Sequence, residues 1–190
     1  MDKRIIKTKR NIKRIMIQML SEKCFEDITV KELCERAETS RITFYTHYSD
    51  KTELANDIID DMTAFAKSEF YRLQSSNNQN GDIVTEYLNL LDCILNTYRE
   101  NYDFFAHTDE SPILRALTLK FINENVGEKI EKDKQRLNLR YPFEMVRNLL
   151  CDGIRGFVIT GRLAGCSADE IRDYSHDLLK RLLVNDVLRK

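Results

Sequence analysis

The fold is decided by residues 28–54, whose sequence is ITVKELCERAETSRITFYTHYSDKTEL. Apolar residues recur with helical spacing over 30–37 and again over 41–48. Only the three residues 38–40 separate these two segments. Two short helices with so tight a connection predict a helix-turn-helix.

Capping residues mark where these helices are expected to begin. Thr29 and Glu32 have the spacing of a capping box, in which each side chain accepts a hydrogen bond from the other residue's backbone N–H. Thr39 or Ser40 precedes the second helix, and either hydroxyl can cap it. Ser49 is expected to cap the long helix that follows.

The second helix has two chemically different faces. Phe44 and Tyr48 lie four residues apart, so we expect both to pack inward together with Leu33. The opposite face carries Arg41, Ile42, Thr43, Tyr45 and Thr46. Arg can bind a guanine edge through two hydrogen bonds, Thr can donate or accept, and Ile or Thr methyl groups can contact a thymine methyl. This face therefore indicates contact with DNA bases.

Basic residues are concentrated at the N-terminal end of the chain. The whole chain has 30 Lys and Arg against 31 Asp and Glu, a formal net charge of -1. Residues 1–52 hold twelve basic and eight acidic side chains, so this segment carries +4 and the remainder -5. A basic head on an acidic body indicates a polyanionic partner for the head alone.

The rest of the chain predicts further helices and no strand. A helix from about 5 to 23 precedes the helix-turn-helix, and a connecting helix of about 50–73 follows it, burying Leu54, Ile58, Met62 and Phe65. Polar turn formers at 74–82 predict an exposed loop. Further helices are expected at 87–98, 102–106, 112–135, 142–165 and 168–188. The expected fold is all-α with about nine helices, divided into domains 1–52 and 53–190.

Composition excludes several classes of protein. With 6 Gly and 2 Pro in 190 residues, the chain lacks the turn formers of an all-β fold. No apolar run approaches the roughly 20 residues of a membrane span, and the charged N-terminus lacks the apolar stretch of a signal peptide, so we expect a cytoplasmic protein without membrane contact. Five widely spaced Cys and three scattered His predict no metal site and no cofactor. No phosphate loop or catalytic constellation is present, so no enzyme is predicted.

Residues 28–54 resemble the DNA-binding signature of the TetR family of transcriptional regulators. The shared features are the Ile-Thr-Val opening, an aliphatic-Ala helix, a Ser-started second helix with Thr-Phe-Tyr, then His-Tyr and Lys-x-x-Leu. The resemblance covers roughly residues 5–55. It implies a three-helix DNA-binding domain followed by a larger helical domain for ligand sensing and dimerisation. Residues 153–166 and onward are similar to a C-terminal subtype common in Firmicutes regulators.

The resemblance also implies roles for individual residues in DNA binding. Those expected to reach base edges are Lys31, Arg41, Ile42 and Thr43. Those expected to hold phosphates and fix the register are Thr29, Ser40, Tyr45, His47 and Lys51. Basic side chains expected to add backbone or minor-groove contacts are Lys3, Arg4, Lys7 and Lys9.

One position departs from the family pattern. The family usually has Gly in the turn between the two helices, where this chain has Glu38. Gly adopts a positive φ without steric hindrance, whereas Glu in that conformation costs roughly 1 kcal/mol. We therefore expect a strained or altered turn, with a negative charge near the DNA-binding surface.

Useful operator specificity requires two copies of the helix-turn-helix. They must lie roughly 34–36 Å apart, one turn of DNA, so we expect a homodimer. Helices 142–165 and 168–188 are expected to form its interface. The candidate interface residues are Leu150, Gly153, Ile154, Phe157, Gly161, Leu178, Leu179 and Leu182.

The larger domain is expected to surround a pocket for a small amphipathic effector. The candidate lining residues, aromatic with a few polar groups, are Tyr87, Cys93, Tyr98, Tyr102, Phe105, His107, Arg115 and Phe121. Aromatic residues at helical spacing are more often plain core packing, and the sequence leaves both interpretations open.

Together these patterns predict a homodimeric repressor that binds a palindromic operator in double-stranded DNA and is released by an unidentified effector. The alternative is a regulatory protein of the same fold that acts mainly through protein–protein contacts, which Glu38 and the overall acidity would favour.

Overall fold

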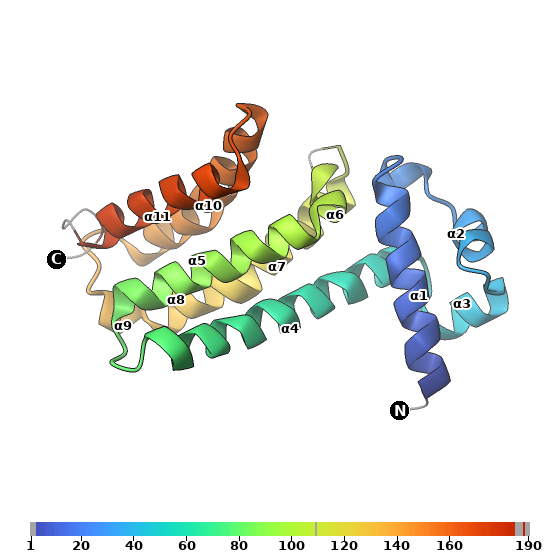
Figure 1. The fold of residues 1–190 in the computed structure, drawn as a ribbon, viewed down its shortest axis with the longest axis horizontal. Helices are drawn as coiled ribbons and strands as arrows, with labels where there is room; N and C mark the ends of the chain where they lie inside the picture. The colour runs from blue at the N-terminus through green and yellow to red at the C-terminus, as the bar shows by residue number, and fades with distance from the viewer. Residues whose placement is uncertain (1–2, 109, 185–187, 189–190) are drawn as a thin grey trace. The chain divides into compact units, whose positions relative to one another are not determined.

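The computed structural model describes residues 3–108, 110–184 and 188 of the chain. Over these residues every regular element is helical, which confirms the predicted all-α class (Figure 1). The elements are α1 (Lys3–Leu20), a 3-10 turn (Phe25–Asp27), α2 (Val30–Arg36), α3 (Arg41–His47), α4 (Lys51–Asn77), α5 (Ile83–Glu100), α6 (Tyr102–Ala106), α7 (Pro112–Ile122), a π-helical turn (Asn123–Gly127), α8 (Glu128–Lys132), α9 (Lys134–Leu137), α10 (Phe143–Leu163) and α11 (Ala168–Val184). None of the described helices has both the length and the apolar character of a membrane span.

The chain divides into two compact units. Unit 1 comprises Met1–Met62 and Glu100–Phe121, and unit 2 comprises Thr63–Arg99 and Ile122–Lys190. The boundary differs from the predicted division after residue 52, because α4 contributes to both units and α6 packs against α1 within unit 1. Whether residues 1–52 act as a separate functional domain stays a prediction.

Unit 1 is built around the apolar face of α1. That face buries Ile12, Ile15, Met16, Met19 and Leu20. Leu33 of α2 and Phe44 of α3 are fully buried in the same unit, and Tyr48 is nearly so. The predicted inward packing of these three residues is therefore confirmed, and it fixes which side of α3 faces outward.

The connecting helix α4 is longer than predicted. Leu54, Ile58 and Met62 are buried as expected, but Phe65 is 42% exposed and the expectation for it was wrong. A spacing of four residues continues from Met62 to the buried Ala66, which turns Phe65 toward solvent.

The loop after α4 begins later than predicted. We expected it at 74–82, but helix α4 continues to Asn77 and the loop occupies 78–82. The Ser75 hydroxyl donates to the Tyr71 carbonyl at 2.9 Å, so this polar side chain is accommodated within the helix.

In unit 2, α10 and α11 lie side by side (Figure 1). α10 ends at Leu163, and Gly165, just after its C-cap, has a φ of 82° that suits only glycine well. A complete capping box then starts α11: Ser167 N–H donates to Glu170 at 2.8 Å, and Glu170 N–H donates to the Ser167 hydroxyl at 3.2 Å. The predicted helix end at 188 cannot be compared, since residues 185–187 lie outside the described part.

The single helix expected over 112–135 is interrupted. It is replaced by α7, the π-helical turn and α8, with α9 following. In the turn, the Arg147 guanidinium of α10 donates to the Asn123 side chain. A contact from another helix therefore accompanies the break, and helical periodicity alone does not reveal it.

Candidate nucleic-acid interface

The exposed side of α3 is the centre of the candidate interface. Ile42 is 83% exposed and Tyr45 56%, an unusual degree for large apolar and aromatic side chains. Arg41 and Thr46 are exposed on the same side. We call these four residues the reading face.

Ser40 fixes the start of α3. Its hydroxyl accepts a hydrogen bond from Thr43 N–H at 3.0 Å and lies 2.9 Å from the Thr43 hydroxyl. Ser40, and not Thr39, is therefore the N-cap. Thr43 is half-buried and its hydroxyl lies within hydrogen-bond distance of the Ser40 hydroxyl. It is therefore less accessible than the four exposed residues of the reading face.

Only half of the predicted capping box at α2 is present. Thr29 accepts a hydrogen bond from Glu32 N–H at 3.2 Å, as expected. The Glu32 carboxylate does not return this bond, because it pairs with Lys23 at 2.5 Å and with Arg36 at 3.1 Å. Charge pairing with two cations replaces the neutral N–H partner in this box.

The turn between α2 and α3 contains the strained residue that the sequence predicts. Glu38 has a φ of 48°, in the left-handed region. Its N–H donates to Glu35 O at 3.2 Å, and Thr39 N–H donates to Cys34 O at 3.0 Å, which is a Schellman ending of α2. From α1, the Asn11 amide donates to Ala37 O at 2.8 Å and holds the same turn.

Lys51 is turned into unit 1. Its ammonium donates to the carbonyl oxygens of Phe25 at 2.7 Å, Glu26 at 2.8 Å and Ile28 at 2.8 Å. Burial lowers the pKa of Lys51, although nearby acids oppose this effect. Since these three bonds use every ammonium hydrogen, a phosphate contact would require one of them to break.

Asp50, and not the predicted Ser49, caps α4. One Asp50 carboxylate oxygen accepts from Thr52 N–H at 2.7 Å and from Glu53 N–H at 2.8 Å. A carboxylate is a strong acceptor at a helix N-terminus, so it displaces the neighbouring hydroxyl from that role. Ser49 N–H donates instead to the Glu53 carboxylate at 2.5 Å.

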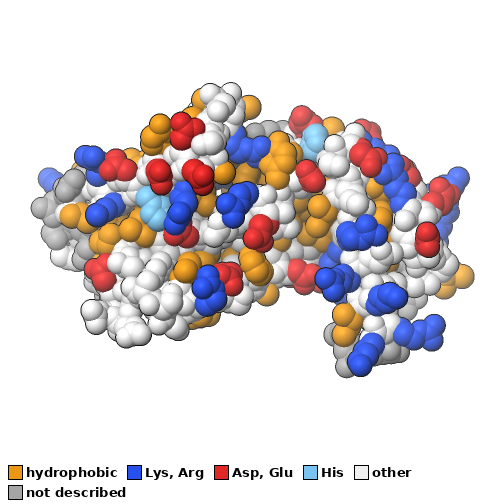
Figure 2. Space-filling model, in the orientation of Figure 1, with side chains coloured by type: hydrophobic (Ala, Val, Ile, Leu, Met, Phe, Trp, Pro, Cys, Tyr) orange, Lys and Arg blue, Asp and Glu red, His pale blue; other side chains and the backbone are white. Residues whose placement is uncertain are grey.

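Helix α1 supplies half of the basic side chains of unit 1. It has seven basic residues and no acidic one, and Figure 2 shows Lys and Arg gathered over this helix. Its basic residues are Lys3, Arg4, Lys7, Lys9, Arg10, Lys13 and Arg14. Lys9 and Lys13 are also structural, because each pairs with Asp57 of α4, at 2.9 and 3.0 Å.

The remaining predicted DNA contacts differ in exposure. Lys31 is exposed in the first turn of α2, and Thr29 and Ser40 are exposed at the helix starts. His47 is half-buried beside Tyr48, with ring centroids 6.5 Å apart. Unit 1 therefore presents the reading face, two capped helix starts and a basic α1. Together these features suit a nucleic acid, whose phosphates are negatively charged and whose base edges offer hydrogen-bonding groups.

A second candidate surface lies on unit 2, between α10 and α11. It is an apolar groove of about 80 Å³. Seven of the eight predicted dimer residues line it, with Leu149 and Ser175: Leu150, Gly153, Ile154, Phe157, Leu178, Leu179 and Leu182. Leu149 is 51% and Leu178 42% exposed, so part of this apolar surface has no partner within the described chain.

Gly161, the eighth predicted dimer residue, does not line this groove. A side-chain carbon at this position would lie 3.0 Å from the Ile171 side chain of α11. Gly161 therefore allows α10 and α11 of one chain to pack closely, a role different from the expected contact between chains.

The predicted effector residues are divided between the two units. Tyr87, Cys93 and Tyr98 lie in unit 2; Tyr102, Phe105, His107, Arg115 and Phe121 lie in unit 1. Phe105 and Phe121 are buried with ring centroids 5.8 Å apart, and Tyr87 lines an apolar cavity of only about 10 Å³. Tyr102 and Arg115 are exposed. A common pocket for these residues stays a prediction.

The sequence did not indicate a larger hollow in unit 2. It has a volume of about 140 Å³ and lies among α4, α5, the π-helical turn and α8. Its lining includes Phe70 and Tyr71 beside Lys67, Lys129 and Lys132. The available signal was aromatic residues beside a lysine on α4 and two lysines on α8, but the meeting of these helices depends on the tertiary fold.

Comparison with known proteins identifies the N-terminal segment. Residues 17–58 match the family model described as bacterial regulatory proteins, tetR family. A segment of 51 residues is 35% identical to the uncharacterized HTH-type transcriptional regulator YxbF of Bacillus subtilis (strain 168). That match spans 27% of this chain and 13% of the length of YxbF.

Solved structures show the same fold over nearly the whole chain. A Syntrophomonas wolfei protein assigned to the TetR family matches with a TM-score of 0.78 and 14% identity, over 94% of this chain and 95% of that one. The reduced form of Escherichia coli NemR matches with a TM-score of 0.63 and 14% identity, over 93% and 98%. Salmonella enterica GusR matches with a TM-score of 0.63 and 19% identity, over 94% of each chain. The resemblance recognised in the sequence is thereby confirmed.

Proposed function

We propose that this chain, which has the fold of TetR-family regulators and a TetR-type helix-turn-helix, regulates transcription by inserting α3 into the major groove of operator DNA. The observation that supports this most is the reading face, where Arg41, Ile42 and Tyr45 are exposed while Phe44 behind them is buried. In this proposal Arg41 and Ile42 read base edges, and Tyr45 and Ser40 hold phosphates.

We further propose that the protein acts as a homodimeric repressor on a palindromic operator. Pairing through the groove between α10 and α11 would present two reading faces to one duplex. A small effector would release DNA by binding better to a form in which the two faces no longer fit the half-sites. We place this action in the cytoplasm, and we assign the protein no enzymatic activity.

A gel-shift titration with the promoter upstream of the chain's own gene tests the proposal. We expect saturable binding that weakens as salt rises, because phosphate contacts release counterions. Arg41→Ala should weaken binding by about 1–3 kcal/mol if Arg41 makes a bidentate base contact. Arg99→Ala is the matched control, since Arg99 is exposed on α5 and lies in unit 2, and it should bind like the parent protein.

Two results would contradict the proposal. The first is absence of a shift at low salt with folded protein. The second is equal binding by the parent and Arg41→Ala proteins. If Arg41→Ala and Tyr45→Ala also left reporter regulation unchanged in cells, action through protein–protein contacts would be favoured instead.

A further inference from the structure

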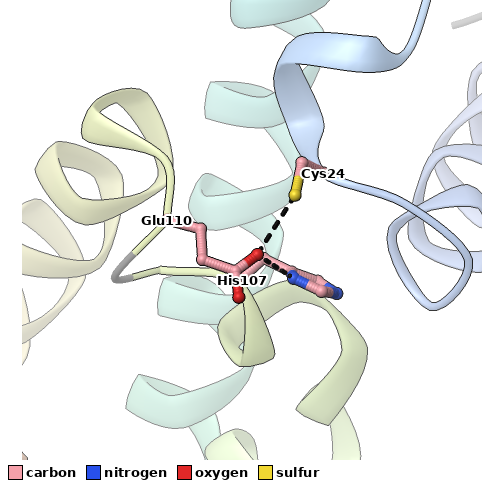
Figure 3. Close-up of side chains that lie close together, drawn as sticks. All are labelled: Cys24, His107 and Glu110. Carbon is pink, nitrogen blue, oxygen red and sulfur yellow. Dashed lines mark hydrogen bonds and ion pairs between the residues drawn. The ribbon is translucent and has the colours of Figure 1, made fainter.

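Three potential metal ligands meet in unit 1, away from the reading face. Cys24 lies between α1 and the 3-10 turn, whereas His107 and Glu110 lie between α6 and α7 (Figure 3). The Cys24 Sγ donates to Glu110 Oε2 at 3.1 Å, and His107 Nδ1 lies 2.8 Å from the same oxygen. The three ligand atoms all lie within 4.8 Å of one another.

This donor set fits zinc. Thiolate sulfur, imidazole nitrogen and carboxylate oxygen are the three ligand types that Zn²⁺ takes in proteins, at bond lengths of about 2.0–2.3 Å. Tetrahedral bonds of that length place neighbouring ligand atoms roughly 3.3–3.8 Å apart. An ion therefore fits if the two hydrogen bonds to Glu110 open by a fraction of an ångström and the Cys24 and His107 ligand atoms, which lie within 4.8 Å, settle at the same tetrahedral spacing.

The surroundings of the three side chains also suit a cation. The carboxylates of Glu110, Asp27 and Glu26 lie close enough to the Cys24 sulfur to act on it electrostatically. The same carboxylates would attract a divalent ion. Cys24 and His107 are partly accessible and Glu110 is exposed, so solvent can reach the cluster.

We propose that Cys24, His107 and Glu110 bind one Zn²⁺ ion, with water as the fourth ligand. On binding, the Cys24 thiol releases its proton to solvent and its sulfur bonds the metal, and the oxidation state of both stays the same. The ion would join the segment after α1 to the connection between α6 and α7, two parts of unit 1 that are distant in sequence. The sequence predicted no metal site because it offers no clustered ligand spacing, and folding supplies the proximity.

Cobalt provides a direct test, because Co²⁺ takes the same ligands and is coloured. Titration of the reduced, metal-free full chain with Co²⁺ should give visible ligand-field bands and a near-ultraviolet thiolate-to-cobalt band, saturating at one ion per chain. Added Zn²⁺ should bleach both. Cys24→Ser should abolish the thiolate band, while Cys166→Ser, the matched control at a half-buried cysteine in unit 2, should retain it.

A second variant separates metal binding from simple hydrogen bonding. Glu110→Gln can keep hydrogen bonds to Cys24 and His107 but loses the anionic ligand. We expect its affinity for Zn²⁺ to fall at least about tenfold, since even loss of an outer-shell partner lowers affinity about 10–100-fold. Circular dichroism of each variant shows whether it folds.

Thermal unfolding supplies a readout that is independent of DNA. Zn²⁺ should raise the melting temperature of the parent chain and of Cys166→Ser, but not of Cys24→Ser, because a ligand of the folded state stabilises it by mass action. Lack of the thiolate band in the parent chain, or an equal band in Cys24→Ser, would overturn the proposal. Both measurements omit DNA, so failure here is distinguishable from failure of the proposed operator binding.

Discussion

Glu38 combines a side chain and a backbone conformation that are poorly matched. Its φ of 48° places the Cβ close to backbone atoms, and glycine escapes this crowding because it has no Cβ. The Schellman hydrogen bonds and the Asn11 contact hold the turn in this conformation, so neighbouring interactions offset the strain. The consequence is a helix-turn-helix whose turn is less stable than it could be.

We expect Glu38→Gly to raise the free energy of unfolding by about 0.5–1 kcal/mol, because relief of the left-handed strain exceeds the added entropy of the unfolded chain. Urea denaturation followed by circular dichroism measures the change. Glu38→Gln retains the Cβ and should leave stability unchanged. Glu35→Gly, inside α2, should lower stability by about 1 kcal/mol. Stabilisation by Glu38→Gln but not by Glu38→Gly would assign the effect to charge and contradict strain.

At the scale of single residues, the sequence predicts the direction in which a side chain points better than it predicts the groups that the side chain contacts. The spacing of Phe44 and Tyr48 suffices to place Ile42 and Tyr45 outside, since a helix has a fixed periodicity. The position of Lys51 was not predictable in this way. Its three carbonyl partners follow α1, and their convergence depends on how the 3-10 turn packs.

Among the elements, an ion-pair cluster links α1, the end of α3 and α4. Asp57 of α4 pairs with Lys9 and Lys13, and accepts a hydrogen bond from the Tyr48 hydroxyl at 2.8 Å. Burial tends to raise the pKa of Asp57, but the hydrogen bonds from Lys9, Lys13 and Tyr48 outweigh it and lower the pKa to about 2. The cluster therefore contributes to the packing that fixes α3 within unit 1.

We expect Asp57→Asn to lower the free energy of unfolding by about 1–2 kcal/mol at neutral pH. Because the folded pKa is about 2 and the ordinary value 3.8, the contribution is complete above about pH 4 and is lost as pH falls toward 2. Denaturant titrations between pH 2 and 7 should show the two stability curves converging on the acid side.

Asp60→Asn is the control on the same helix. Asp60 pairs with Lys120 at 2.7 Å, but its side chain is 52% exposed, so its loss should cost only about 0–1 kcal/mol. A difference between parent and Asp57→Asn that stays constant down to pH 2 would contradict the assigned linkage.

The capping bonds at helix starts were predictable where no residue from elsewhere in the fold competed for the capping side chain. Within the described residues no cation pairs with Glu170, and the capping box of Ser167 and Glu170 is complete. Thr29 and Glu32 have the same spacing, but Lys23 and Arg36 draw the carboxylate away. The break after α7 is a similar case, because it involves Arg147 from a distant helix.

For the whole molecule, the groove between α10 and α11 makes association testable. We expect Leu178→Glu to raise the dimer dissociation constant at least about tenfold, because a charge would be buried between two apolar surfaces. Analytical ultracentrifugation measures this, and operator affinity should fall in parallel. Leu119→Glu changes an equally exposed leucine of unit 1 and should leave association intact. A dimeric Leu178→Glu protein would exclude this groove as the interface.

At the same scale, the sequence indicated which residues line the groove but not which surround an effector. The groove belongs to two adjacent helices whose faces follow from periodicity. The eight aromatic and polar candidates come from α5, from α6 and α7 and from the connection between them, and they are divided between the two units; several are ordinary core residues. Periodicity identifies the buried face of a helix, whereas a cavity forms only where the packed side chains of several elements leave space.

The apolar groove has a consequence for gene dosage. Under the proposed pairing, the species that represses is a dimer, and its abundance at low concentration varies with the square of the number of chains. Halving the copies of the gene would then lower the active species by about fourfold, which mass action requires whenever most chains are unpaired. If the proposed pairing through these exposed leucines holds, the output of the regulated promoter would be steeply sensitive to how much protein each cell inherits.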